Sequence, residues 1–199
     1  MQVEDGKMTT IGVLGIQGAV REHINSLEKI DEVEAVKVRT LEELNSIDGL
    51  IIPGGESTAI GKLLNDFNLM KPLKERIENG MPVWGTCAGM ILLAKEIDND
   101  SRRHISAMDI EVMRNGYGSQ LDSFSTEIKI DEVSKNPVKL VFIRAPYVKK
   151  VWGDTKVLAK IDDKIVACRE KNMLATAFHP ELTKDTSFHE YFVNMVKEK

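Results

Sequence analysis

The chain has 199 residues, of which 42% are hydrophobic and 29% are charged, the proportions of an ordinary globular domain. Its net charge is −4 and its acidic and basic residues are interspersed, so the charge pattern does not indicate a nucleic-acid partner. No apolar run approaches the ~18–20 residues that cross a bilayer, the first residues lack the apolar segment of a signal peptide, and two cysteines make no disulfide framework. We therefore expect a cytoplasmic protein with one domain over residues 1–199, of which residues 1–8 form a loose extension.

The first half of the chain alternates short apolar runs with helical patterns. Strands are predicted at Thr10–Ile16, Val33–Val38, Gly49–Ile52 and in a fourth run that ends at Trp84. A helical pattern follows each of them: over about 20–30, from a capping-box sequence at 40–43, over 58–67 and 70–79, and from 90 onward. Strands that alternate with helices in this way predict a doubly wound, mostly parallel sheet.

The second half is richer in strands. After a polar segment at 98–103, which we expect to be an exposed loop, strands are predicted at 109–113, 124–130, 138–143, 156–161, 165–168 and 174–178. The segment 124–130 alternates apolar and polar residues, and 156–168 has a hairpin pattern around two aspartates. A helix is predicted at 186–196. We expect these strands to be partly antiparallel and to extend the edge of the parallel sheet.

The fourth strand leads into Gly85-Thr86-Cys87-Ala88-Gly89, a cysteine between two glycines at two-residue spacing. Strand, sharp turn and helix form the setting of a nucleophile elbow, which exposes a reactive side chain at the turn. The flanking glycines allow the tight backbone turn, and the positive end of the following helix favours the thiolate. A buried cysteine that only closes the turn is the structural alternative. The second cysteine, Cys168, is expected to pack in the core.

Two further loops follow predicted strands and carry polar residues. Gln17 comes after the first strand, where ligands bind in open α/β sheets, although it can equally satisfy loop backbone. The segment Pro53–Thr58 has two adjacent glycines whose N–H groups can form an anion nest or an oxyanion hole. Ser57 or Thr58 can cap the helix that follows. Glu56 would repel phosphate, so an amino-acid ligand with an ammonium group fits this loop better than a phosphate does.

The last strand ends at His179-Pro180-Glu181. In an extended segment held by proline, residues two apart point the same way, so Glu181 can hold one imidazole nitrogen of His179. Cys87 and His179 both follow strand ends, which share one rim in a parallel sheet, and the three side chains therefore predict a nucleophilic triad. A zinc site and a surface His–Glu pair without a role are the alternatives. The other histidines have no comparable setting: His23, His104 and His189, the last of which is expected on the closing helix.

These motifs resemble those of class I, triad-type glutamine amidotransferases, whose signature pairs G-x-C-x-G with a later H-P-E. Within that class, five blocks resemble the glutaminase subunits of pyridoxal 5'-phosphate synthase and together cover almost the whole chain. The blocks lie at 17–23 (QGAVREH), 53–58 (PGGEST), 85–90 (GTCAGM), 142–146 (FIRAP) and 179–183 (HPELT). The resemblance implies a flavodoxin-like α/β fold. The sequence departs from the family where Ser119 stands in place of a longer residue, and 98–108 is poorer in small apolar residues.

The resemblance implies that a triad of Cys87, His179 and Glu181 hydrolyses L-glutamine to L-glutamate and ammonia. The residues that it implies for glutamine binding are Gly55, Glu56, Ser57, Arg114, Ile143 and Arg144. The implied oxyanion-hole donors are the backbone N–H groups of Gly55 and Ala88, and Gln17 would contact a loop or the partner. An arginine, either Arg114 or Arg144, can pair with the substrate carboxylate, and Glu56 with its ammonium group.

The resemblance also implies a partner. The ammonia would pass to a synthase subunit in a hetero-oligomer, with no metal, nucleic acid or membrane involved. Pyridoxal 5'-phosphate would be the product of that assembly, and the chain itself would hold no cofactor.

Two other functions stay open at this point. The chain can be the glutaminase subunit of another pathway, such as histidine or purine synthesis, although the blocks at 17–23 and 142–146 argue against it. It can also be a regulatory module that kept the fold and lost turnover, which three intact triad residues disfavour.

Overall fold

The computed structural model describes residues 8–118 and 123–199, so Ser119 and most of the expected N-terminal extension lie outside the described residues. The parallel part of the main sheet contains five strands of the described chain, in the order β2 (Val33–Val38), β1 (Thr9–Leu14), β3 (Gly49–Ile52), β4 (Val83–Thr86) and β12 (Met173–Thr176). The four inner strands, β1, β3, β4 and β12, are almost fully buried, as expected for a parallel sheet covered on both faces, whereas the edge strand β2 is partly exposed. The doubly wound, mostly parallel α/β fold is confirmed.

The second half of the chain extends this sheet beyond β12. The added strands run in the order β11 (Lys164–Glu170), β9 (Tyr147–Val151), β6 (Met108–Met113) and β5 (Ala94–Ile97), with β10 (Lys156–Ile161) paired to β11. Most of these pairs are antiparallel, whereas β5 and β6 are parallel. Two strands predicted as part of the extension, β7 (Ser123–Ile128) and β8 (Val138–Ile143), pair with each other in a separate two-stranded sheet.

Two strands of the extension were not predicted. The apolar run that follows Cys87 reads as one helix, but the helix ends at Leu93 because Ala94 adopts an extended conformation (φ −62°, ψ 135°) and begins β5. β9 is short and half exposed, and only Val148 within it is buried, so its pattern is too weak to separate from a loop. Both strands are defined by the neighbours that pair with them.

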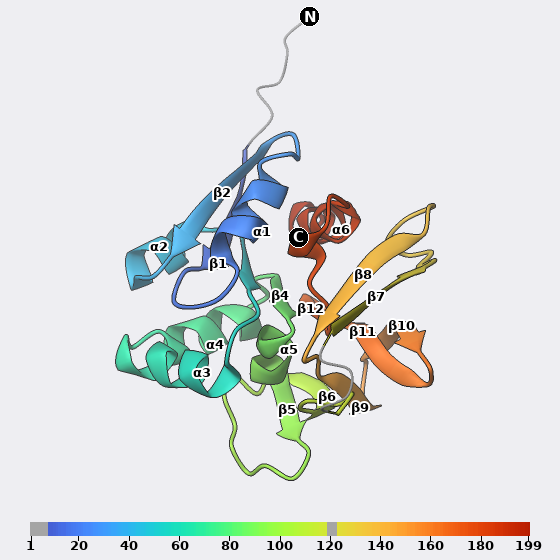
Figure 1. The fold of residues 1–199 in the computed structure, drawn as a ribbon. Coiled ribbons are helices and arrows are strands. Elements are labelled where there is room, and N and C mark those ends of the chain that lie inside the picture. Colours follow the sequence, from blue (N-terminus) through green and yellow to red (C-terminus); the bar gives the residue numbers. More distant parts are fainter. Residues whose placement is uncertain (1–7, 119–122) are drawn as a thin grey trace, which may run out of the picture.

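Figure 1 shows helices on both sides of the parallel strands. One side carries α1 (Val20–Leu27) and α6 (Ser187–Lys197), and the other carries α2 (Leu41–Ser46), α3 (Ser57–Asp66), α4 (Met70–Glu78) and α5 (Ala88–Leu93). α6 packs its buried Phe188 and Phe192 against Trp84 of β4, with ring centroids 6.2 and 5.8 Å from the indole. The C-terminal helix is therefore fixed to the strand that leads to Cys87.

Among the described helices, α2 and α3 begin with a side-chain cap, and one of these two caps differs from the prediction. The predicted capping box is present at α2, where Glu43 N–H donates to Thr40 Oγ1 at 3.2 Å and Thr40 N–H donates to the Glu43 carboxylate at 3.0 Å. The prediction that Ser57 or Thr58 caps α3 is wrong. The helix begins one residue earlier, so the Glu56 carboxylate takes the cap position and accepts from two backbone N–H groups of the first turn, at 3.2 and 2.7 Å.

Gly85 and Gly89 allow β3, β4 and α5 to approach closely. A Cβ atom on Gly85 would lie 2.4 Å from the Gly89 carbonyl, and one on Gly89 would lie 2.2 Å from the carbonyl oxygen of Ile52. Neither position tolerates a side chain without movement of backbone. This close packing brings Cys87, at the start of α5, next to the loop that follows β3.

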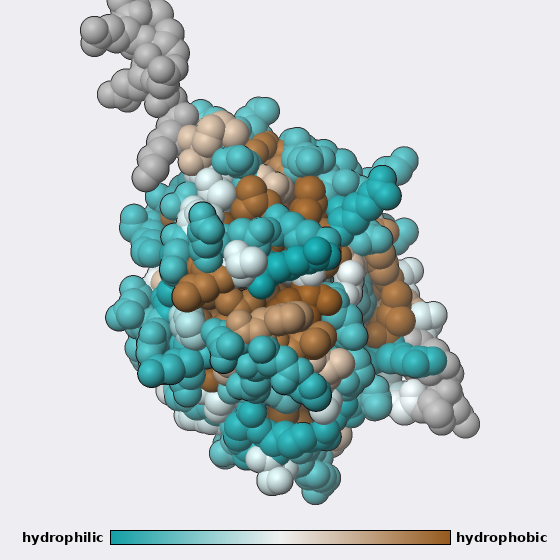
Figure 2. Space-filling view, turned by 90° about the vertical axis from the view of Figure 1, so that its left-hand side faces the viewer, coloured by the Kyte–Doolittle hydropathy of each residue, from teal (hydrophilic) through white to brown (hydrophobic). Residues whose placement is uncertain are grey.

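The face that carries β2, α2, α3 and α4 is seen in Figure 2, where a band of hydrophobic side chains crosses the middle between hydrophilic borders. Elements of this face contribute exposed Leu41 on α2 and Phe67 at the end of α3, at 47% and 54% exposure. In the described part of the chain no helix is both long enough and apolar enough to pass through a bilayer.

The close approach at Gly89 leads to a stability prediction. Helix propensity alone predicts that Gly89→Ala stabilises the protein by ~1 kcal/mol. The contact with Ile52 predicts the opposite, a loss of ~1–3 kcal/mol in the free energy of unfolding, measured by urea denaturation. Gly80→Ala is the comparison, because this glycine has open space around it, so any loss there reports the strain of its positive φ of 95° and not a packing clash. A Gly89→Ala protein as stable as wild type would contradict the packing account.

Candidate active site

The loops after β1, β3, β4 and β12 meet at one edge of the sheet, as the parallel strand order requires. A pocket of about 510 Å³ opens there. It is lined by residues from five segments: Gly55, Glu56, Ser57, Cys87, Ala88, Ile91, Arg114, Asn115, Ile143, Arg144, Pro146 and His179. The residues expected to bind glutamine and to form the oxyanion hole are all among them, while Glu181 lies behind the pocket.

Cys87 stands at the turn between β4 and α5 in a strained conformation. Its φ is 51° and its ψ is −104°, values that cost a non-glycine residue ~1–3 kcal/mol. The turn is held because Cys87 N–H donates to the carbonyl of Thr176, on the neighbouring strand β12, at 2.8 Å. The side chain is 8% exposed, and this small exposed part faces the pocket that it lines.

His179 follows β12 and lies beside Cys87. A Cβ atom added to Gly54 would be 2.6 Å from His179 Cε1 and 3.5 Å from Cys87 Cβ, so both side chains crowd the same point of the loop after β3. His179 Nδ1 lies 2.7 Å from Glu181 Oε1, a short charge-assisted contact. The three side chains named by the sequence are thus brought together in the order thiol, imidazole, carboxylate.

The reason given for the His179–Glu181 contact is wrong, although the contact is present. Residues Pro180–Leu182 form a 3-10 turn and not an extended segment, and His179 precedes it at φ −112°, ψ 81°. Proline suits the first position of such a turn, because it needs no N–H there. The turn folds the chain back, and the Glu181 side chain reaches the imidazole that precedes it.

The electrostatics of this site favour a protonated His179. Burial alone would lower its pKa, but hydrogen bonds to Cys87 and Glu181, together with the charge of both groups, raise the pKa of His179 to about 10. Burial, together with the charge of Glu170, raises the pKa of the Cys168 thiol to about 12. Of the two cysteines, Cys87 is the one that lies beside a histidine that can act as a base.

The loop after β3 is held by Gln17. The Gln17 side-chain carbonyl accepts from Glu56 N–H at 2.8 Å, and the neighbouring Gly18 has no room for a side chain, since a Cβ there would meet the Gly54 carbonyl oxygen at 1.7 Å. On the other side of Cys87, the N–H of Ala88 is the first of α5 and so has no partner within the helix. Two backbone segments with N–H groups therefore flank the thiol.

A charged cluster borders the pocket and includes a loop that sequence reasoning treated only as exposed. Arg114 lies 3.2 Å from Glu56 Oε1 and 3.4 Å from Asp100 Oδ2. Arg102 bonds to Asp100 and also to Thr58 Oγ1, at 2.9 Å for the latter. The Arg102 contacts hold the pKa of Asp100 well below its usual range. Asp100 and Arg102 thus connect the segment 98–103 to the start of α3, and no local pattern in the sequence indicates that contact.

Two histidines that the sequence left without a role lie behind the triad. His23 on α1 and His189 on α6 are both fully buried, and His23 Nε2 is 3.5 Å from Glu181 Oε2. The sequence does not indicate this arrangement of the two histidines, because α1 and α6 are distant in sequence and meet only in the folded protein. His104 is different: it lies against Gly61 of α3, outside this group.

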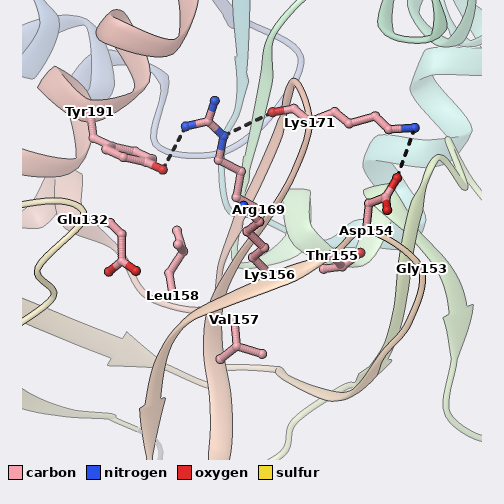
Figure 3. A pocket seen from close by; sticks show the side chains of 10 residues that line it. All are labelled: Glu132, Gly153, Asp154, Thr155, Lys156, Val157, Leu158, Arg169, Lys171 and Tyr191. Atoms are coloured by element: carbon pink, nitrogen blue, oxygen red, sulfur yellow. Dashed lines mark hydrogen bonds and ion pairs between the residues drawn. The ribbon is translucent and has the colours of Figure 1, made fainter.

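A larger cavity, of about 1060 Å³, shares no lining residue with this pocket. Figure 3 shows it between the β10–β11 hairpin and α6, with Arg169 bonded to Tyr191 Oη at 3.0 Å and Lys171 paired with Asp154 at 3.6 Å. Its lining residues do not include Cys87, His179 or Glu181. Within residues 8–118 and 123–199 there is no group of three or more His, Cys, Asp or Glu side chains arranged to hold a metal ion.

The fold and the cysteine elbow together define a class of protein, the α/β glutamine amidotransferases. A solved glutamine amidotransferase superposes with a TM-score of 0.88 at 38% identity, over 94% of this chain and 98% of that one. A putative GMP synthase subunit from Thermoplasma acidophilum, at 15% identity and a TM-score of 0.65, has the same fold.

The family follows from the sequence comparisons. Residues 13–198 match the SNO glutamine amidotransferase family, and the chain belongs to this family. It is 62% identical to the pyridoxal 5'-phosphate synthase subunit PdxT of Ruminiclostridium cellulolyticum, over 95% of this chain and 100% of that protein. It is 58% identical to the subunit of the same name from Carboxydothermus hydrogenoformans, over 94% and 97%.

The pKa of His179 can be tested by NMR of histidine-labelled protein. With a pKa of about 10, the imidazole should stay protonated through pH 8. The stability that this raised pKa contributes is fully present below the unfolded-state pKa of about 6.5, and it is lost as the pH rises through about 10. In Cys87→Ala the pKa should fall, because a hydrogen bond and a charge that raise it are removed. Titration near pH 6.5 in both proteins would contradict this electrostatic picture.

Proposed function

We propose that this chain is the glutaminase subunit of a pyridoxal 5'-phosphate synthase and hydrolyses L-glutamine to L-glutamate and ammonia through Cys87, His179 and Glu181. The observation that carries the proposal is the 2.7 Å contact between His179 Nδ1 and Glu181 Oε1, beside a cysteine held in a strained elbow. Nucleophile, base and orienter stand in the order that nucleophilic catalysis requires. The membership of the SNO family and the names of the relatives support the assignment.

The reaction proceeds in two halves. The Cys87 thiolate attacks the side-chain amide carbon of glutamine, and the oxyanion that forms is stabilised by the backbone N–H groups of Gly55 and Ala88. His179 gives its proton to the leaving nitrogen, the C–N bond breaks, and ammonia departs from a γ-glutamyl thioester. His179 then removes a proton from water, which attacks the thioester and releases glutamate and the thiolate.

The charged groups at the pocket fit the two ends of an amino acid. The substrate carboxylate pairs with Arg114 or Arg144, and its ammonium group pairs with Glu56. Arg144 has a positive φ of 44°, an unusual conformation that accompanies its place on the pocket wall. Gly55, Ser57 and Ile143 complete the contacts.

The ammonia passes to a synthase subunit in a hetero-oligomer, and pyridoxal 5'-phosphate is the product of the assembly. The exposed apolar side chains at the active-site edge support a partner that covers it. Ile143, in the pocket wall, and Leu182, next to Glu181, are 40% and 47% exposed. Two free cysteines also fit the reducing environment of the cytoplasm, which is the location that we propose.

Replacing the nucleophile tests the proposal most simply. Cys87→Ala should lower kcat for glutamine hydrolysis by at least about 10⁴-fold, because no other group can form the thioester. The urea unfolding curve should change little, because only a sulfur atom at the pocket surface is lost. Cys168→Ala is the matched control and should keep its activity. Near wild-type turnover by Cys87→Ala would overturn the triad mechanism.

The substrate contact of Glu56 is tested with two variants. Glu56→Gln keeps an oxygen that can cap α3 but removes the charge that meets the ammonium group. We expect KM for glutamine to rise about 10-fold, the lower end of the range for a charge-assisted contact, because the side chain is 54% exposed and screened. Glu56→Ala should do the same and also lose ~1 kcal/mol of stability with the cap. An unchanged KM in both variants would place Glu56 outside the glutamine site.

The isolated chain should be a poor glutaminase that its synthase partner activates. The loop 53–57 contains two adjacent glycines, so its peptide groups can turn away from the productive direction at little cost. A partner that binds only the productive state and favours it by ~3 kcal/mol would raise turnover by roughly 100-fold, and by linkage glutamine would tighten the complex. The measurements are glutaminase rates with and without excess synthase subunit, and the Kd of the complex with and without glutamine in Cys87→Ala. Full activity of the isolated chain would contradict partner activation.

A further inference from the structure

The two buried histidines behind Glu181 form a continuous polar path between helices. His23 Nδ1 lies 2.9 Å from His189 Nε2, so these two ring nitrogens share one proton in a hydrogen bond. The other ring nitrogen of His23 lies 3.4 Å from Thr86 Oγ1 and 3.5 Å from Glu181 Oε2. Glu181 Oε2 is buried, and within the described residues it has no hydrogen-bond partner of good geometry. His23 Nε2 is thus a ring nitrogen that faces this oxygen and can donate to it.

We propose that His189 and His23 form a neutral relay that holds the second oxygen of the Glu181 carboxylate and so positions His179 for catalysis. In this relay His189 Nε2–H donates to His23 Nδ1, and His23 Nε2–H points at Glu181 Oε2. The inference rests on the proposed glutaminase function and adds two positioning residues to it. Neither histidine lines the glutamine pocket.

The tautomers follow from counting donors. If His23 donated to His189 instead, His23 Nε2 would turn a lone pair toward the carboxylate oxygen, and His189 would carry its proton on Nδ1. His189 Nδ1 is buried without a hydrogen-bond partner in the described structure. A buried N–H without an acceptor costs ~1–3 kcal/mol, more than a bare ring nitrogen does. In the arrangement that we propose, His23 turns an N–H and not a lone pair toward the carboxylate, and His189 Nδ1 carries no proton that would need an acceptor.

The relay carries no positive charge. Burial, together with the neighbouring His189 and His179, lowers the pKa of His23 well below its usual value, and burial lowers the pKa of His189 to about 3. Lys29 lowers and Asp185 raises the pKa of His189, so these two charges oppose each other. Within the described residues, Glu181 therefore faces one cation, His179, and its negative charge is available to that imidazole.

The surroundings fix both rings in place. The His189 and His23 rings stand edge-on to Trp84, with centroids 5.0 and 5.8 Å away, and the indole is itself held because its N–H donates to Thr176 Oγ1 at 3.0 Å. Phe188 and Phe192 close the same side of Trp84. In this water-poor setting a neutral hydrogen bond keeps its strength and its direction.

The relay predicts a spectroscopic signature that does not depend on activity. In ¹⁵N-histidine-labelled protein, His23 and His189 should both appear as neutral Nε2–H tautomers from pH 5 to pH 9, assigned through His23→Gln and His189→Gln. A His23 with its proton on Nδ1, or a protonated His23 in this range, would overturn the proposal whether or not the chain hydrolyses glutamine.

The second test measures the activity of variants in the complex with the synthase subunit. His23→Phe keeps an aromatic ring but removes the donor, so the Glu181 carboxylate can turn away from His179. We expect kcat to fall roughly 10–100-fold with KM for glutamine unchanged, and the pKa of His179 to move down toward its ordinary value. His23→Gln, whose amide can donate to Glu181, should keep most of the turnover and the raised pKa. His189→Phe should lie between them.

Phe192→Leu is the packing control, because it disturbs the aromatic cluster without touching the relay. It should lower the urea midpoint and leave kcat and the pKa of His179 unchanged. If His23→Phe and Phe192→Leu lower stability alike and neither changes the pKa of His179, the histidines serve packing only and the proposal fails. Absence of turnover by the wild-type complex would contradict the proposed function instead, and the tautomer measurement would still decide the relay.

Discussion

The buried carboxylate of Glu181 is the constraint on which the site depends. Its side chain is inaccessible to water, and an unpaired buried carboxylate is among the costliest groups that a protein can hold. One oxygen is satisfied by His179 at 2.7 Å, and the other faces His23 at 3.5 Å. These contacts require the turn after β12 to meet helix α1, and His23 of α1 in turn contacts His189 of α6. The pKa of about 10 at His179 is a further consequence, since Glu181 and Cys87 together outweigh the effect of burial on that imidazole.

A second constraint acts on the backbone around the nucleophile. The positive φ of Cys87 is an unfavourable conformation, and it is maintained because α5 packs tightly on β3 and β4 through Gly85 and Gly89. The same packing places the thiol beside Gly54, where His179 also lies. Rigid elements thus fix the thiol and the imidazole, whereas the loop 53–57 depends on Gln17 and on the cap formed by Glu56. We connect this difference to the proposed roles: the nucleophile is preorganised, and the oxyanion loop is the part that a partner can adjust.

Much of the fold was predictable from the sequence, because its signals are local. Alternating strands and helices gave the doubly wound sheet, and the capping box at Thr40 gave the start of α2. Other features depend on distant partners: β5 and β9 exist because neighbouring strands pair with them, and β7 and β8 pair with each other away from the main sheet. The site divides in the same way, since motifs identified Cys87 and the His179–Glu181 pair, but the reason offered for that pair was an extended segment where the structure has a 3-10 turn. His23 ends the block at 17–23, but no role for it could be read from the sequence, because its contact with Glu181 exists only where α1 crosses behind that residue.

The central claim is that Cys87 forms a covalent bond with the substrate, and its most direct test is to observe that bond. The complex with the synthase subunit is mixed with glutamine, quenched in acid within the first turnover, and digested for mass spectrometry. The account predicts that the peptide containing Cys87 gains the mass of one γ-glutamyl group, that hydroxylamine removes it, and that the peptide containing Cys168 is unchanged. Glutamine hydrolysis that proceeds with no adduct on Cys87 under these conditions, or with an adduct on Cys168, would contradict the account.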